Sequence, residues 1–377
     1  MIIPSQKHLF DIPDDVAYLN NAYMSPLMFK VVEAMETGIS RKARPWDYRS
    51  DEFFTYAEEA RVLAGKIFRG AADNIAIVPS ASYGLQIAAN ALPLSKGQNI
   101  LVLEDQFPSN IYPWQDRVAK EGAQLAILAT PNDDDWTRVL LEAIDSQTAI
   151  IAIPQTHWAS GATIDLESIR RALDDVGGAL ALDLTQSLGA QPFDVMQVRP
   201  DFAVVATYKW MMGPYSMGFL YVDPKWHGAD PLENNWMNRS GSEDFTALTQ
   251  YRDDFQPAAR RFDMGEKSNP AQLLGASAAM QQILDWGVDN VAKTLRAKTD
   301  YIAENLNPNV IMPLGRERRA PHYLGLRFSG GVPNGLASEL AQDKIYISVR
   351  GLAMRVTPHL YSTQTDIDRL ISALNNI

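Results

Sequence analysis

The sequence predicts an α/β fold with a mostly parallel, seven-stranded sheet flanked by helices, followed by a smaller C-terminal α+β domain. Continuous apolar runs are typical of strands that are buried on both faces of a sheet. Their alternation with longer amphipathic segments favours parallel strands joined by helices. After residue 222 the pattern changes to a polar loop, two helices and short strands. The seven apolar runs lie between about residue 75 and residue 222 and read NIAIV, NILVL, QLAILA, AIIAIP, ALALDL, DFAVVA and MGFLYV.

The remaining elements follow from local signals in chain order. Residues 51–70 read as a helix closed by Gly70, and residues 223–265 are rich in polar residues, as an exposed loop is. A helix with Pro270 near its start and Gly287 at its end comes next, then a second helix, short strands and a last helix from about residue 364. We therefore predict an N-terminal segment over 1–25, a large domain over 26–262 and a small domain over 263–377.

The composition limits the classes of function. The chain has 377 residues, a net charge of −11 and no cysteine. Acidic chains gain nothing from the counterion release that drives nucleic-acid binding, so we expect no nucleic-acid partner. The apolar runs are too short to span a bilayer and the N-terminus is too polar for a signal peptide, which favours a cytoplasmic protein without a membrane partner. Without cysteine, disulfides, thiolate metal sites and protein-thiol mechanisms are excluded.

Several common catalytic motifs are missing. Residues 213–218, GPYSMG, have the outer glycines of a phosphate-binding P-loop but lack its lysine, and no G-x-G-x-x-G follows a strand. The five histidines are scattered without metal-ligand spacing, so we expect no metal site. No G-x-S-x-G nucleophile elbow is present. These absences disfavour dehydrogenases, nucleotide hydrolases, metallohydrolases and serine hydrolases.

Charged and hydroxyl residues follow three of the predicted strands. Asp183 ends ALALDL, Lys209 follows DFAVVA, and residues 79–82, PSAS, precede a helix. Open α/β sheets bind ligands at the carboxyl ends of their strands. Pyridoxal phosphate (PLP) accounts for all three: its aldehyde condenses with a lysine, its ring nitrogen pairs with a carboxylate, and its phosphate suits a helix N-terminus. Taken singly, the lysine could be solvated, the aspartate could cap a helix and PSAS could be an ordinary turn.

The chain resembles the class V aminotransferases, a branch of the fold-type I PLP enzymes that contains cysteine desulfurases, kynureninase and isopenicillin N epimerase. The resemblance runs nearly end to end. The motifs that carry it are YLNNAYMSPL (18–27), PSASYGLQ (79–86), EDQFPSNIYPWQ (104–115), ALDLTQSLG (181–189), YKWMMGPYSMGFLYV (208–222) and RVTPHLYSTQTDIDRL (355–370). The lysine segment and the C-terminal motif are the specific ones.

The resemblance implies a role for each matched position around the cofactor ring. Lys209 forms the Schiff base, and Asp183 pairs with the pyridinium nitrogen. Gln186 donates to the phenolic oxygen of the ring. Phe107 stacks on one face, where the family often has histidine, and Thr185 packs against the other.

The resemblance also implies contacts at the two ends of the cofactor. Ala81 and Ser82 supply donors for the phosphate, and Arg355 grips the substrate carboxylate. Asn21 and Arg350 are further candidates for substrate contact. The family usually forms homodimers with the site at the interface.

Three positions depart from the family pattern. Tyr208 replaces the usual histidine before the lysine, where its phenol could reach the phosphate. Trp158 stands near the position of an asparagine that touches the cofactor in many members. Ser268 follows a segment in which the family often has Gly-Thr, and it is the candidate phosphate hydroxyl from a neighbouring subunit.

The implied chemistry is proton removal from Cα of an amino acid by the released lysine. Our first expectation is an aminotransferase acting on a small amino acid. A β-eliminating lyase or an epimerase is the alternative among enzymes, and an inactive PLP-fold binding protein is the alternative of another class. Because the chain has no cysteine, a desulfurase that forms a protein persulfide is not expected.

Overall fold

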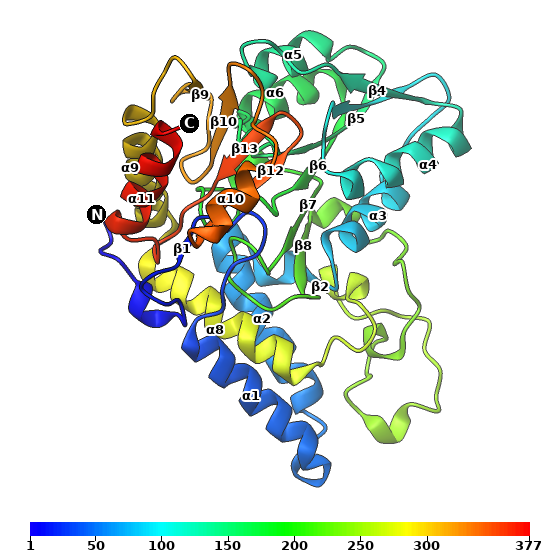
Figure 1. The fold of residues 1–377 in the computed structure, drawn as a ribbon. Helices are drawn as coiled ribbons and strands as arrows, with labels where there is room; N and C mark the ends of the chain where they lie inside the picture. Colours follow the sequence, from blue (N-terminus) through cyan, green and yellow to red (C-terminus); the bar gives the residue numbers. More distant parts are fainter.

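The fold centres on a seven-stranded sheet, as the sequence predicts. The computed structural model describes residues 1–377 and places the strands in the order β2-β8-β7-β6-β5-β3-β4 (Figure 1). The pairs β4–β3, β3–β5, β5–β6 and β6–β7 are parallel, whereas β8 runs antiparallel to both β7 and β2. The strands are β2 (Ile75–Val78), β3 (Asn99–Leu103), β4 (Gln124–Leu128), β5 (Thr148–Pro154), β6 (Ala179–Asp183), β7 (Phe202–Ala206) and β8 (Gly218–Val222).

Helices cover both faces of this sheet. Successive side chains of a strand point to opposite faces. In β2, Ile75 and Ile77 join the core under α2 and α6, while Ala76 and Val78 join the core under α3 and α4. The helices of this part are α1 (Phe29–Ala43), α2 (Glu52–Phe68), α3 (Ala81–Ala91), α4 (Tyr112–Glu121), α5 (Trp136–Ala143), α6 (Leu166–Val176) and α7 (Val195–Val198).

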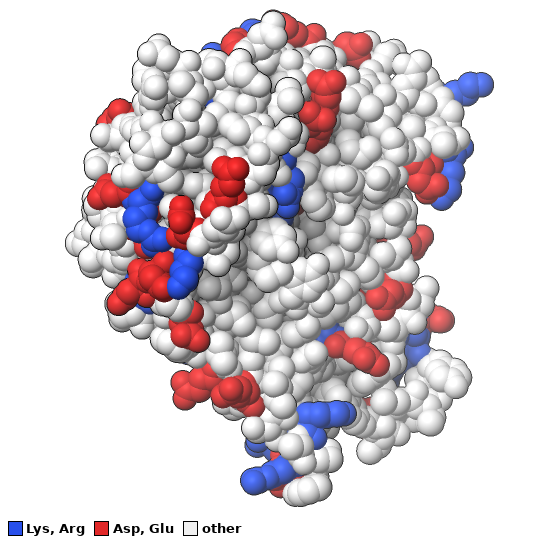
Figure 2. Space-filling view, viewed as in Figure 1, with Lys and Arg blue, Asp and Glu red and all other residues white.

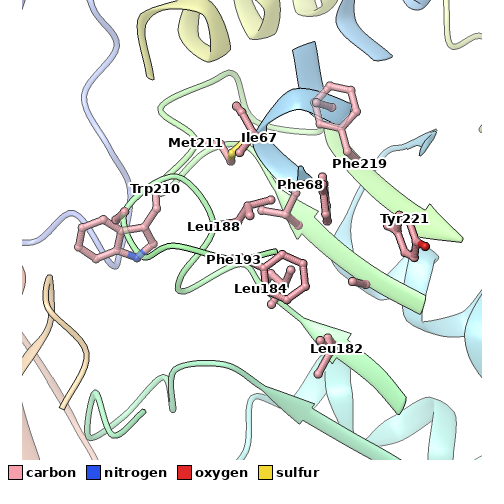
Figure 3. Close-up of a cluster of buried hydrophobic side chains, with 14 of the residues drawn as sticks. Ile67, Phe68, Leu182, Leu184, Leu188, Phe193, Trp210, Met211, Phe219 and Tyr221 are labelled. Carbon is pink, nitrogen blue, oxygen red and sulfur yellow. The ribbon is translucent and has the colours of Figure 1, made fainter. Parts of the chain in front are cut away.

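The segment after β7 is anchored in the larger core. Figure 3 shows Trp210 and Met211 among the buried side chains of this cluster, which also contains Phe68 from α2 and Phe219 from β8. Trp210 and Met211 are fully buried. The residues that follow Lys209 in the chain therefore fix its backbone against the sheet.

The C-terminal part builds a second, antiparallel sheet with the order β12-β13-β10-β9. Its core is separate and includes residues of the N-terminal segment, because β1 (Ala17–Tyr18) pairs with β11 (Ile345–Tyr346). The other elements are α8 (Pro270–Trp286), α9 (Val288–Glu304), β9 (Ile311–Pro313), β10 (Leu324–Phe328), α10 (Leu336–Gln342), β12 (Ser348–Arg350), β13 (Ala353–Val356) and α11 (Gln364–Asn375). Since α8 packs along α1 and α2, the division at residue 263 stays a prediction.

Two local expectations differ from the structure. QLAILA forms β4, but this strand lies at the sheet edge and Ile127 is 55% exposed, so its apolar pattern does not reflect full burial. Helix α2 ends at Phe68, and Arg69, with φ 57°, takes the left-handed cap position expected for Gly70. No helix is long and apolar enough to cross a membrane.

Candidate active site

A cavity of about 270 Å³ lies at the carboxyl ends of the central strands. Parallel strands bring these ends to one edge of the sheet, and the segments after β2, β3, β5, β6 and β7 all contribute to the lining. Nine predicted site residues line it: Ala81, Ser82, Phe107, Trp158, Asp183, Thr185, Gln186, Tyr208 and Lys209.

Lys209 is a buried cation without a carboxylate in direct contact. Its side chain is 7% exposed, and its Nζ lies 5.4 Å from the ring centre of Phe107 and 5.3 Å from that of Tyr208. Burial lowers the pKa of Lys209 to about 8, with Arg355 and Arg350 acting in the same direction and Asp183 opposing them. A buried amine that loses its proton near neutral pH can act as a nucleophile and as a base.

Asp183 ends β6 beside the cavity. Its Oδ1 accepts a hydrogen bond of 3.0 Å from the backbone N–H of Thr185. Burial raises the pKa of Asp183, while Thr185 and the charge of Lys209 oppose this effect. A buried carboxylate without a bonded cation is costly unless a ligand supplies one. A protonated ring nitrogen would meet that requirement.

The start of α3 forms another part of the cavity lining. Ser80 caps the helix by accepting from the N–H of Tyr83 at 3.2 Å. The N–H groups of Ala81 and Ser82 lie in the first turn and have no acceptor within the helix. Tyr208 lines the same cavity, and its hydroxyl has no protein partner. These groups suit a phosphate, because free N–H groups and the helix dipole favour an anion there.

Gln186 is held by two neighbouring groups. Its Oε1 accepts from the indole N–H of Trp210 at 2.9 Å, and its Nε2 donates to the carbonyl oxygen of Ala22 at 3.1 Å. The Nε2–H of His322 donates to the backbone carbonyl oxygen of Gln186 at 2.6 Å, which fixes the backbone as well. The second N–H of the amide is left for a ligand in the cavity. This N–H can make the predicted hydrogen bond from Gln186 to the phenolic oxygen of the cofactor ring.

Two aromatic rings, Phe107 and Trp158, form part of the cavity wall. Phe107 packs edge to face with Trp158, at 5.3 Å between ring centres and 81° between planes. The indole N–H of Trp158 donates to the carbonyl oxygen of Asp105 at 2.5 Å. Trp158 therefore has no free donor for a cofactor, unlike the asparagine of the family pattern. It can contact a cofactor through its ring alone.

The two arginines expected at the substrate do not line the cavity. Arg355 is 2% exposed and forms no ion pair; its Nε and Nη2 donate to Ser348 Oγ at 2.9 and 2.7 Å, and its Nη1 donates to the carbonyl of Trp158 at 3.2 Å. Arg350 is partly exposed and donates to the carbonyl of Val349 at 2.7 Å. Neither guanidinium has a carboxylate partner. A buried arginine bonded only to neutral oxygens is a suitable site for an incoming carboxylate.

Asn21 and Ser268 lie outside the cavity. Asn21 is fully buried, with Nδ2 donating to the carbonyl of Lys209 at 3.4 Å and Oδ1 accepting from Tyr361 at 3.1 Å. Its amide is thus engaged with the protein, and it contacts the lysine backbone rather than substrate space. The hydroxyl of Ser268 donates to the carbonyl of Phe53, so within one chain it contacts no residue of the phosphate end.

The structure also reveals site residues that the sequence did not single out. Two signals were present: the EDQFPSN segment was already matched to the family, and strand ends were already expected to hold ligands. Pro79 and Ser80 of the PSAS segment also line the cavity, and the lining residues not singled out before are Gln106, Ser109, Asn110, Pro154, Thr156, Ala206, Tyr215, Ser216 and Met217.

The residues present fit PLP. A lysine with a lowered pKa, a buried carboxylate without a cation, a helix start with free N–H groups and an aromatic face surround one cavity. When bound, PLP serves as the electron sink that makes the Cα proton of an amino acid removable. Lys209, Asp183, Gln186, Phe107 and the start of α3 would hold it.

Two relatives match this chain along nearly its whole length. A protein named probable cysteine desulfurase from Pyrococcus abyssi is 23% identical over 97% of this chain and 96% of its own length. One of the same name from Methanothermobacter thermautotrophicus is 26% identical over 97% of this chain and 96% of its own.

Solved structures share the architecture. The apo cysteine desulfurase of Thermococcus onnurineus NA1 superposes with a TM-score of 0.85 at 19% identity, covering 100% of this chain and 99% of that one. The cystine C–S lyase C-DES with cysteine persulfide gives 0.86 at 19% identity, covering 97% and 98%. A C-DES mutant carrying glycine linked to PLP gives 0.88 at 18% identity, covering 99% of both chains. The family model described as Aminotransferase class-V matches residues 17–370, and the chain therefore belongs to this family of PLP-dependent enzymes with the fold-type I architecture.

Proposed function

We propose that this protein is a PLP-dependent lyase that eliminates a β substituent from a small sulfur-containing amino acid and releases both products to solvent. The observation that carries the proposal is Lys209, a buried amine with a pKa lowered to about 8 in a cavity whose other ionisable side chains are Asp183, Tyr208 and Tyr215. Lys209 takes the Cα proton, and the bond from Cβ to sulfur breaks with its electrons on sulfur. Cysteine and water would give sulfide, pyruvate and ammonium.

Two further points support elimination with release. The chain has no cysteine, so it cannot hold sulfur as a protein persulfide. The relatives and structural neighbours carry the names cysteine desulfurase and cystine C–S lyase. Together these favour cleavage of a C–S bond without a protein thiol as acceptor.

An aminotransferase, our first expectation from the sequence, is the second candidate. The same lysine would serve it, and another relative, at 24% identity over 84% of this chain, is named as an uncharacterized aminotransferase from Bacillus subtilis. An epimerase with two bases is disfavoured, because beside Lys209 the cavity lining contains no second lysine and no histidine. An inactive binding protein is disfavoured by the intact Lys209 and Asp183.

The test is to incubate the PLP-loaded protein with L-cysteine, L-cystine and a panel of small amino acids, with Lys209→Ala as the control. We expect sulfide or persulfide together with pyruvate, in equal amounts, and no accumulation of pyridoxamine phosphate. Pyridoxamine phosphate formed in step with a 2-oxo acid would instead establish the aminotransferase. No product from any member of the panel would favour the binding protein.

We also propose a cytoplasmic homodimer. Ser268 does not reach the phosphate end of its own cavity, which agrees with a role toward a second copy. On the face shown in Figure 2, acidic and basic side chains are interspersed, which favours neither a nucleic-acid nor an anionic-membrane partner. Light scattering on the purified protein would test the dimer, and a monomer at micromolar concentration would contradict it.

A further inference from the structure

Trp158 contacts the Asp105–Phe107 segment of the cavity wall on one side and Arg355 on the other. On one side its indole N–H holds the carbonyl of Asp105, whose φ is 54°, and its ring edge packs on Phe107 at 5.3 Å. On the other side its carbonyl oxygen accepts from Arg355 at 3.2 Å and from the hydroxyl of Tyr323. The residue is therefore held in place from both parts of the chain.

The indole ring is also the cavity wall on the side of Arg355. Trp158 lines the cavity, whereas Arg355 does not, although its guanidinium carbon lies 5.8 Å from the ring centre. A substrate whose amine meets Lys209 and whose carboxylate turns toward Arg355 must pass beside this ring. Its side chain then competes with the indole for the same space.

The space available is small. Pockets that enclose drug-sized ligands measure about 300–1,000 Å³, and this cavity of about 270 Å³ must first hold the cofactor. Trp158 also cannot donate a hydrogen bond to a substrate, since its one indole N–H is already bonded to the carbonyl oxygen of Asp105. The ring therefore offers a substrate side chain an apolar surface and a steric limit, and no hydrogen bond.

From these contacts we infer that Trp158 is a specificity-determining residue that restricts the substrate to amino acids with small side chains. The inference rests on the proposed function only in placing the substrate amine at Lys209 and its carboxylate toward Arg355. It does not depend on whether elimination or transamination follows. A residue with a small side chain at this position would open the cavity toward Arg355 and admit bulky amino acids.

The test compares wild type with Trp158→Ala and Trp158→Phe, each loaded with PLP. The readout is amino-acid binding, measured as the change in visible absorption of the bound cofactor during titration with L-alanine and with L-phenylalanine. In Trp158→Ala the ratio of the two dissociation constants should shift toward L-phenylalanine by about tenfold or more, the range expected for pocket-size discrimination. Trp158→Phe keeps a ring and should shift the ratio far less.

Cofactor content and melting temperature serve as folding controls. If Trp158→Ala fails to retain PLP, Trp158→Leu, which keeps an apolar contact with Phe107, should shift the ratio in the same direction by a smaller factor. Equal weakening for both amino acids, or an unchanged ratio in variants that keep the cofactor, would overturn the inference and leave Trp158 a purely structural role. Products of the wild-type reaction decide the proposed function separately.

Discussion

Lys267 and Lys209 are both buried lysines near an aspartate, but their surroundings differ. Lys267 is 2% exposed and its Nζ lies 2.6 Å from Asp263, which also accepts from Arg61 at 2.8 and 3.0 Å and from the N–H of Ile77 at 2.7 Å. Burial alone would raise the pKa of Asp263, but Arg61 and Lys267 hold it below its usual value. In this cluster, every charge has a partner.

Lys209 and Asp183 are buried to a similar extent, but their charges are not paired by direct contacts like those around Asp263. They form no ion pair, the pKa of Lys209 is lowered mainly by burial, and burial raises that of Asp183. The difference indicates that the Asp263 cluster stabilises the fold by linking α2 and β2 to the segment before α8. The Lys209 site instead retains unsatisfied groups that a cofactor can satisfy, at some cost to the stability of the apo protein.

The largest difference between the effect on activity and the effect on stability is expected for Lys209→Ala. Activity should fall by about 10³-fold or more, because under the proposed function this change removes both the general base and the covalent anchor. The stability of the apo protein should not fall, since a buried cation without an ion pair is removed. Turnover assays and urea denaturation measure the two effects, and the loss of the visible absorption band of lysine-bound cofactor serves as a control. A variant that keeps that band would contradict the assignment of Lys209.

The reverse pattern is expected from Asp263→Ala. Removing this carboxylate leaves Arg61 and Lys267 buried without a partner, which should lower the free energy of unfolding by about 3–5 kcal/mol. The matched variant Asp183→Ala should change the stability of the apo protein much less, because no cation is bonded to it. Chemical denaturation of both apo variants measures the difference. Equal losses would show that the two aspartates have the same structural role.

The pH dependence of stability should report the burial of Lys209. The pKa of Lys209 falls from 10.5 in the unfolded chain to about 8 in the folded one. Between these values the unfolded state binds more protons, so the stability of the apo protein should rise with pH, by about 3 kcal/mol in total for this group. Measuring the free energy of unfolding of wild type and of Lys209→Met from pH 7 to 10.5 isolates the contribution of Lys209. A difference between them that does not change with pH would contradict the lowered pKa.

The smallest effect is expected from Tyr208→Phe, which removes a hydroxyl that has no protein partner. If the phenol donates to the cofactor phosphate, the dissociation constant of PLP should rise about tenfold, as for one hydrogen bond to a charged group. Tyr215, whose ring centre lies 4.6 Å from that of Tyr208, is the matched control, and Tyr215→Phe should leave PLP affinity unchanged. Fluorescence titration of the apo proteins measures both. The opposite ranking would assign the contact to Tyr215.

Much of the fold and part of the site could be predicted from the sequence. All seven predicted strands form the central sheet, and six of the uninterrupted apolar runs are buried there; β4, at the sheet edge, is the exception. Asp183 and Lys209 could be matched to each other because parallel strands end at one edge. Ala81, Ser82 and Phe107 followed from the family motifs, and all three line the cavity.

Other features depend on contacts between segments far apart in the chain. The exposure of β4 follows from its place at the sheet edge, which its own residues do not encode. Asn21 was expected at the substrate, yet its amide bonds to the backbone of Lys209, 188 positions away. Trp158 looked like a cofactor contact, and only the bond from its indole to Asp105 shows that its donor is occupied.

The sequence by itself determined the fold class and the cofactor, because these follow from local patterning, from residue types at strand ends and from the family motifs. The tertiary structure decided which charges are satisfied. Asp263 and Asp183 are both carboxylates in apolar surroundings, and their local sequences do not reveal that one meets two cations while the other meets none. Charge satisfaction depends on distances between side chains from separate elements, and those distances exist only in the folded chain.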